Sequence, residues 1–148
     1  MRSRIRQVTR FFDIDEANAT LDEVAPLLAT LADQRADLIR LRDQTLAARP
    51  TDGGRASADT QAGRIDDAEV RRIQLRMKGI IDQMAAAVAR IDALGITLRD
   101  IERGLIDFPA LVNGRQVWLC WQLGDNGVTT WHELDDGFGG RRSIAELE

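Results

Sequence analysis

The clearest pattern in the chain is an uninterrupted helical stripe in its second half. Apolar or small residues recur there at alternating intervals of three and four positions: Val70, Ile73, Met77, Ile80, Met84, Ala87, Ile91 and Leu94. This spacing places them on one face of an α-helix. Asp66 and Glu69 have capping-box spacing, Gly95 fits the left-handed residue that ends a helix, and Ile96 would complete a Schellman motif. We therefore predict one continuous helix between Asp66 and Gly95.

A similar stripe precedes it in the first third of the chain. Its apolar or small positions are Ala17, Leu21, Val24, Leu27, Leu31, Leu38, Leu41, Thr45 and Ala48. Asp13 with Glu16 forms a capping box at the start, and Thr20 with Glu23 offers a second one. Pro26 removes a backbone donor and clashes with the preceding turn. We therefore expect a short helix to about residue 25, then a kink or restart, and a straight helix to about residue 48.

Residues 49–64 join the two stripes and contain Pro, Gly, Ser, Thr and Asp without an apolar period, which predicts a flexible connector. Two apolar stripes joined by one connector are expected to pack antiparallel, which gives a coiled-coil-like helical hairpin over residues 13–95. Leu75, Ile81 and Val88 lie outside its seam. A second chain or the C-terminal part is expected to cover them.

After the second helix the apolar period changes to two. Two alternating segments flank Asn113-Gly114, the strongest short signal for a β-hairpin. A two-residue turn there places Asp107 opposite Cys120, and Pro109 predicts that its strand is an edge at that point. Further short strands are expected at 129–134 and at 96–98. The predicted fold is α+β: a long antiparallel two-helix hairpin followed by a small antiparallel β-meander of three to four strands over residues 96–148.

Charge and hydropathy exclude several functions. The net charge is −4, and four arginines lie in a basic N-terminal arm, residues 1–12, so the remaining residues sum to −8. An acidic body argues against nucleic-acid binding, which depends on neutralising phosphates. Apolar runs are too short to span a membrane, and the arm lacks the apolar core of a secretory signal. We therefore expect a cytoplasmic protein without a membrane association.

Reactive side chains gather near the C-terminus. His132, Glu133, Asp135 and Asp136 could hold a divalent ion or perform acid–base chemistry, and Arg141 could bind an anion. Alternatively, the aspartates cap a turn and the arginine pairs with an acid. Because the spacing matches no known ligand pattern, the structural interpretation is favoured, and the sequence predicts neither a metal site nor a particular cofactor.

Asp107, Cys120 and His132 also have the residue types of a nucleophilic triad. Cys120 lies between two tryptophans in an apolar strand, so an inert buried thiol is the favoured interpretation. One cysteine and one histidine exclude a disulfide within the chain and a structural zinc site of several Cys and His ligands. The charged turn at 99–104 is either a salt-bridged loop or one wall of a groove against the 137–142 loop, and the sequence leaves both open.

The tryptophans suggest a binding surface. Trp118 and Trp121 are three apart in a strand and therefore point to opposite faces, of which only one can pack on the helices. The other is expected to meet the C-terminal loop or another molecule. With Trp131, Asp107 and Arg141, these residues are the candidate binding residues.

Four segments resemble a bacterial family known only as a domain of unknown function, DUF2203: Phe11–Asn18, Ile101–Leu111, Asn113–Gly124 and Trp131–Arg141. The resemblance covers most of the chain outside the arm and the connector. It supports the architecture and implies a small, cytosolic bacterial protein, but no activity, cofactor or partner.

Two functional hypotheses remain. The first is a non-enzymatic binding or assembly module, in which the helical hairpin mediates self-association or docking to a protein partner and the tryptophan-bearing sheet contributes a recognition surface. The alternative is a small metal-dependent or hydrolytic enzyme that uses the cluster of His132, Glu133, Asp135 and Asp136. The absence of a catalytic motif favours the first.

Overall fold

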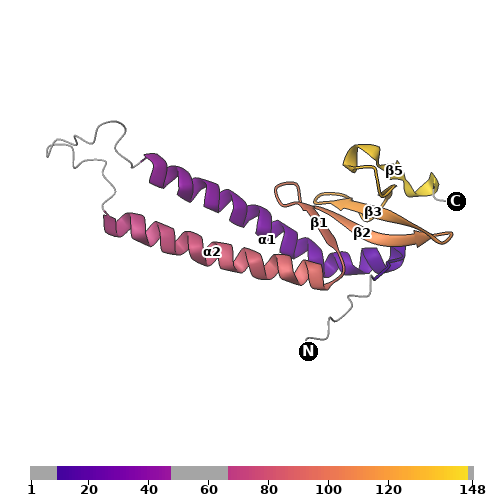
Figure 1. The fold of residues 1–148 in the computed structure, drawn as a ribbon, viewed down its shortest axis with the longest axis horizontal. Coiled ribbons are helices and arrows are strands. Elements are labelled where there is room, and N and C mark those ends of the chain that lie inside the picture. The colour runs from indigo at the N-terminus through magenta and orange to yellow at the C-terminus, as the bar shows by residue number, and fades with distance from the viewer. Residues whose placement is uncertain (1–9, 48–66, 147–148) are drawn as a thin grey trace, which may run out of the picture. The chain divides into compact units, whose positions relative to one another are not determined.

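The computed structural model describes residues 10–47 and 67–146, whose helices and strands are drawn in Figure 1. Residues 1–9 of the basic arm and the connector at 49–64 lie outside the described residues. The elements follow in the order α1 (Ile14–Ala47), α2 (Asp67–Ala93), β1 (Thr97–Asp100), β2 (Leu105–Val112), β3 (Arg115–Gln122), β4 (Thr130–His132), the 3-10 turn η1 (Phe138–Gly140), β5 (Arg142–Ser143) and the 3-10 turn η2 (Ile144–Glu146).

The strands form one antiparallel sheet in the order β1-β2-β3-β4-β5, so each strand pairs with its neighbour in sequence. This is the predicted meander, and the α+β class is confirmed. The sheet has five strands where three to four were expected. The additional strand, β5, contains two residues and is therefore too short to show an alternating pattern.

The central hairpin has the predicted turn and register. Asn113 and Gly114 have φ angles of 53° and 78°, as a type I′ turn requires. All eight residues of β2 pair with β3, and Asp107 lies directly opposite Cys120. On its other side, β2 pairs with β1 only from Leu105 to Asp107, and the Phe12 amide donates to the Pro109 carbonyl at 2.7 Å. β2 is therefore an edge strand at Pro109, as the missing backbone donor of proline predicted.

The first helix begins where the sequence predicted but has no restart. Asp13 Oδ1 accepts from the Glu16 amide at 2.7 Å, which confirms the capping box. The Thr20 hydroxyl donates to the Glu16 carbonyl instead of capping a new helix. The restart expected at Pro26 is wrong, because α1 is continuous through it. Fully buried residues on both sides, Val24 and Leu28 among them, hold the helix where one backbone hydrogen bond is missing.

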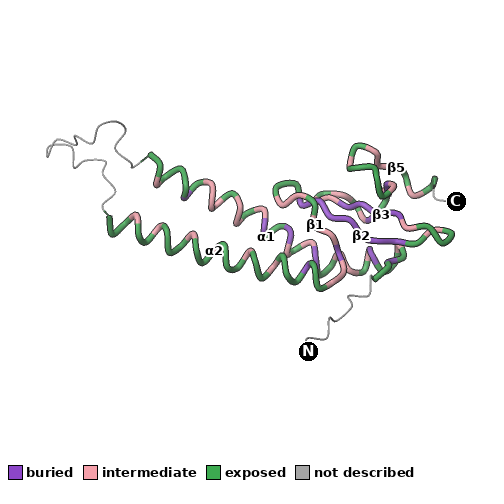
Figure 2. Tube along the Cα trace, in the orientation of Figure 1, coloured by how far each residue is buried: buried purple, intermediate pink, exposed green. Residues whose placement is uncertain are grey.

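The second helix confirms its predicted stripe. Every residue of the stripe from Val70 onward is buried or half-buried, whereas the positions between them are exposed (Figure 2). Gly95 has a φ of +86°, and the amides of Gly95 and Ile96 donate to the carbonyls of Asp92 and Ile91. These two bonds form the predicted Schellman motif. The proposed cap Asp66 lies outside the described residues.

The chain divides into two compact units. In the sheet unit (residues 10–32 and 87–146), Arg90 pairs with Glu23. In the helical unit (residues 33–47 and 67–86), Gln34 Nε2 donates to Gln83 Oε1 at 3.1 Å. Residue numbers rise along α1 as they fall along α2, so the helices run antiparallel, as a hairpin requires. No helix among the described residues has both the length and the hydropathy needed to cross a bilayer.

Alternation along the strands divides the sheet into two faces. The core face carries the residues of the hydrophobic core: Ile106, Phe108, Ala110, Val117, Leu119, Trp121 and Trp131, all of them buried. Phe12, which precedes α1, packs edge-to-face on Phe108 with ring centroids 5.1 Å apart. The opposite face, which we call the site face, carries Asp107, Cys120 and His132. Burial on the core face therefore fixes the positions of the polar residues on the other side.

Candidate metal centre

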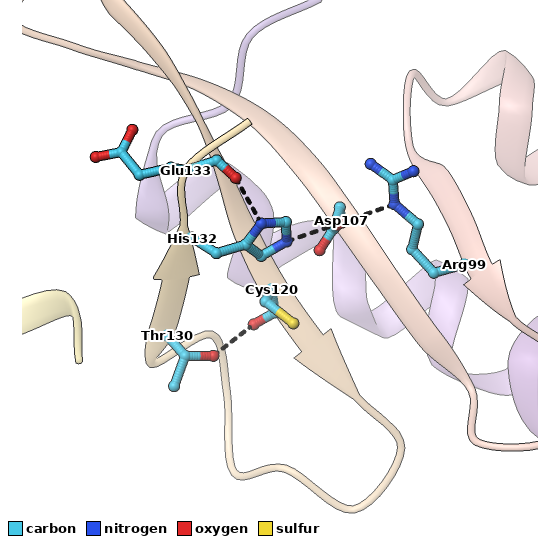
Figure 3. Close-up of polar contacts among 6 residues, drawn as sticks. All are labelled: Arg99, Asp107, Cys120, Thr130, His132 and Glu133. Carbon is cyan, nitrogen blue, oxygen red and sulfur yellow. Dashed lines mark hydrogen bonds and ion pairs between the residues drawn. The ribbon is translucent and has the colours of Figure 1, made fainter. Parts of the chain in front are cut away.

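Three side chains from three neighbouring strands meet on the site face (Figure 3). Asp107 lies in β2, Cys120 opposite it in β3, and His132 in β4, where it pairs with Trp118. Each offers one atom that could bind a metal ion: a carboxylate oxygen, the thiol sulfur and a ring nitrogen. These atoms all lie within 4.8 Å of one another, and all three residues are buried. The sheet therefore builds a compact set of three different ligand types.

The histidine is held with a defined ring orientation. Its Nδ1 lies 2.9 Å from the Glu133 main-chain carbonyl oxygen. A carbonyl can only accept, so Nδ1 carries a hydrogen and donates it. The other nitrogen, Nε2, lies 3.0 Å from Asp107 Oδ2. A neutral ring would present a lone pair there to an ionised carboxylate, so a proton or another cation must lie between the two atoms.

The aspartate has more acceptor capacity than the protein satisfies. Asp107 Oδ2 accepts from Arg99 Nε at 2.8 Å and faces His132. Its other oxygen, Oδ1, is buried and accepts no hydrogen bond from any described residue. Leaving a buried polar atom unpaired costs on the order of 1–3 kcal/mol. A cation bound beside Oδ1 would remove this cost.

The cysteine is not a nucleophile in this arrangement. The pKa of the Cys120 thiol is raised from 9.0 to about 12, chiefly by burial and next by the Asp107 carboxylate, while Arg141 partly offsets the rise. The ring nitrogens of His132 contact Asp107 and the Glu133 carbonyl, so the imidazole has no nitrogen left to deprotonate Cys120. The residue types of a triad come together, but in a geometry that suits metal binding better than covalent catalysis. A coordinated metal deprotonates a thiol directly.

The three ligand types fit a zinc-type ion. Zn²⁺ binds thiolate, imidazole and carboxylate with bonds of about 2.0–2.3 Å, so tetrahedral ligand atoms lie roughly 3.3–3.7 Å apart. The observed separations, all within 4.8 Å, would need to change by up to about 1.5 Å, which side-chain rotation can supply. Mg²⁺ and Ca²⁺ prefer sets of six or more oxygens, and this cluster provides one carboxylate. The chemistry of the site therefore favours zinc or a similar transition metal.

A pocket of about 290 Å³ opens onto the three ligands. Its walls also include Arg99 from β1, Leu105 from β2, and the segment 134–138 that follows β4. The protein offers three ligands where a tetrahedral ion takes four, and the pocket adjoins all three. The fourth position would therefore face a space large enough for a small molecule.

Comparison with known proteins places the chain in a family. The profile of a family described as an uncharacterized conserved protein (DUF2203) matches residues 10–144. The chain belongs to this family. No curated protein and no solved structure matches it. The resemblance seen in the sequence is thus confirmed.

The pocket brings together some of the predicted catalytic residues and excludes one. His132, Asp135 and Asp136 all line it; His132 is buried and the two aspartates are exposed. Glu133 is not among the lining residues, and its carboxylate pairs with Arg115 at 2.7 Å. Glu133 therefore contributes only its main-chain carbonyl to the site. The acidic cluster expected from the sequence is divided between the pocket and the surface beside it.

The predicted binding residues are also divided. Asp107 lines the pocket, whereas Trp121 and Trp131 are buried in the core of the DUF2203 fold and offer no surface to a partner. Trp118 is half-buried on the site face beneath the guanidinium of Arg99, which lies 4.9 Å from the ring centroid. Arg141 stacks on Phe138, at 4.1 Å, and contacts Asp125 at 3.4 Å.

No metal site is predicted from the sequence because the three ligands have no characteristic spacing along the chain. The ligands here come from three separate strands, and only Asp107 and Cys120 could be paired from the central turn. Arg99 was noted only within a charged turn. The short strand expected at 96–98 ends one residue before Arg99, whereas β1 extends to Asp100.

Proposed function

We propose that this DUF2203 protein binds one zinc-type metal ion through Asp107, Cys120 and His132 and uses it for metal-assisted hydrolysis of a small molecule. The observation that carries the proposal is an unsatisfied acceptor inside a cluster of three ligand types: the buried Asp107 Oδ1 lacks a hydrogen bond, and the cluster also offers His132 and Cys120. A metal ion would satisfy Oδ1 and would bind His132 Nε2 in place of a proton. It would also take the Cys120 sulfur as its third ligand.

Contacts around the ligands support the same assignment. Metal-binding histidines usually donate their other ring hydrogen to a carbonyl or carboxylate, as His132 Nδ1 does to Glu133. Arg99 orients the Asp107 carboxylate through Oδ2 and leaves Oδ1 available. The Thr130 hydroxyl donates to the Cys120 carbonyl at 3.2 Å and so links β4 to β3 beside the site. The ligands are thus held before a metal arrives.

The open coordination position supports hydrolysis over a purely structural role. A zinc-type ion with one open position polarises a substrate carbonyl and lowers the pKa of bound water to about 7. Structural zinc sites, in contrast, are closed by four protein ligands. Leu105, Leu134 and Phe138 on the pocket wall would exclude part of the bulk water from the reacting groups. A reduced thiol ligand also suits the bacterial cytoplasm, where we place the protein.

Titration of metal-free protein with Co²⁺ tests the proposal. Wild type should bind one Co²⁺ per chain and develop visible bands together with a thiolate-to-cobalt charge-transfer band. Cys120→Ala should lose that band and bind at least about a hundredfold more weakly. Glu133→Gln is the matched control, because its side chain points away from the ligands, and it should bind as wild type does. Failure of wild type to bind Co²⁺ or Zn²⁺ at micromolar concentration would refute the assignment.

Exposed apolar residues support a second candidate function, self-association through the helical unit. Leu75 and Ile81 of α2 are 64% and 51% exposed, which is unusual for aliphatic side chains on a helix that already buries its seam. A second copy of the chain would cover them. Wild type should then sediment as a dimer at micromolar concentration, and the Leu75→Lys, Ile81→Lys double variant as a monomer. A monomeric wild type would exclude this candidate without affecting the metal site.

A further inference from the structure

Arg99 combines a fixed guanidinium with unused hydrogen-bond donors. Its Nε donates to Asp107 Oδ2 at 2.8 Å, and its guanidinium carbon lies 4.9 Å above the ring of Trp118. These two contacts hold the planar group in place at the pocket wall. Its terminal nitrogens, Nη1 and Nη2, hydrogen-bond to no described residue, and the side chain is 41% exposed. Charged donors therefore remain available to a molecule in the pocket.

We propose that the pocket binds a small monocarboxylate, with its anionic group on the terminal nitrogens of Arg99, next to the open position of the metal. This inference rests on the proposed function, because the metal is expected at Asp107, which Arg99 contacts. A guanidinium and a carboxylate match in a planar, two-bond geometry. Arg99 would thus orient the substrate while its Nε orients a metal ligand.

The remaining wall residues favour a carboxylate over a phosphate. Asp135 and Asp136 both line the pocket and are exposed, so their negative charges would repel a dianion more strongly than a monoanion. The apolar side chains of Leu105, Leu134 and Phe138 suit a short carbon body. At about 290 Å³ the pocket is at the lower end of the range for small-molecule sites, so the ligand must be small.

The test uses protein saturated with Co²⁺, in which the visible spectrum reports on groups that approach the metal. Acetate should perturb the spectrum in a saturable way, butyrate should bind about tenfold more tightly because it buries two more methylene groups, and inorganic phosphate should bind more weakly than acetate. Arg99→Gln should weaken acetate binding at least about tenfold. Arg99→Lys keeps the positive charge but cannot form two parallel hydrogen bonds to a carboxylate, so its affinity for acetate should lie between those of wild type and Arg99→Gln.

Arg115→Gln is the matched control, because Arg115 pairs with Glu133 and is not among the residues of the pocket. It should bind acetate as wild type does. If Co²⁺ binds but acetate leaves the spectrum unchanged, or perturbs it equally in Arg99→Gln, the carboxylate site is wrong and the metal centre stands. Tighter binding of phosphate than of acetate also overturns the proposal. If Co²⁺ does not bind at all, the metal centre itself fails, and this inference fails with it.

Discussion

Replacement of Asp107 by asparagine separates the fold from the metal centre. The side chain is 2% exposed, and asparagine has nearly the same shape. In the variant, the amide oxygen can take the place of Oδ2 and accept from Arg99 Nε, which leaves the amide nitrogen in the place of Oδ1 and away from His132 Nε2. The Nδ1 hydrogen still pairs with the Glu133 carbonyl. The variant therefore keeps the hydrogen bond from Arg99 but loses the charged pair with His132, and we expect it to remain folded with a free energy of unfolding without metal that is lower by about 1–3 kcal/mol.

The same substitution removes a negatively charged ligand, so stabilisation by metal should disappear. Free Zn²⁺ at a hundred times its dissociation constant stabilises a native protein by about 2.7 kcal/mol. For a chain of 148 residues, each kcal/mol raises the melting temperature by about 3–4 °C, so wild type should gain roughly 8–11 °C. Asp107→Asn should gain less than about 2 °C. Calorimetry with Zn²⁺ and with EDTA measures the increase in melting temperature of each protein. An equal increase in the two would refute the assignment of Asp107 as a ligand.

Two further predictions concern the sheet unit. The pKa of the Cys120 thiol is higher in the folded protein, about 12, than its ordinary value of 9.0, so the stabilisation it provides is complete below pH 9 and is lost as the pH rises toward 12. Between pH 8 and pH 10.5, in EDTA, the urea concentration at the unfolding midpoint should fall more for wild type than for Cys120→Ala. An equal fall in the two proteins would contradict the raised pKa of Cys120. Gly104 has a φ of +61°, and an added Cβ would lie 2.4 Å from Leu123, so Gly104→Ala should cost about 2–4 kcal/mol. Gly114→Ala, with a positive φ but open space, should cost only about 1 kcal/mol in the same urea assay, and equal losses would contradict the steric argument.

Much of the fold could be predicted because its signals are local. Asp13 and Glu16 are three residues apart and form the capping box of α1. The Asn113-Gly114 turn fixes the register of the eight residue pairs between the two strands that flank it. The helix restart predicted at Pro26 is wrong. The tendency of proline to end a helix is outweighed there by the burial of side chains on both sides of it. One missing hydrogen bond costs less than the packing of fully buried side chains on both sides of it.

The candidate site was only partly predictable, because its third ligand depends on a longer connection. Seven residues separate β3 from β4, and no two-residue turn fixes their register. The pairing of His132 with Trp118 follows instead from burial, since Trp131 must face the core beside Leu119. Alternation along β4 then turns His132 to the other face. The role of Arg99 was missed because the register shifts at its position in β1, an irregularity without a sequence signal.

Ligands on paired strands behave differently from ligands on a flexible loop. In a zinc finger the metal orders the chain, so its binding energy becomes folding energy. Here the backbone of the DUF2203 protein is fixed by strand pairing and by a core on the opposite face of the sheet, independently of any metal. Arg99 and the Glu133 carbonyl already orient Asp107 and His132. The cost that remains is one buried acceptor without a partner, Asp107 Oδ1. A site whose fold is complete but which leaves a buried carboxylate oxygen unpaired is suited to bind a cation without refolding, and this is why asparagine at position 107 should remove the metal and leave the chain folded.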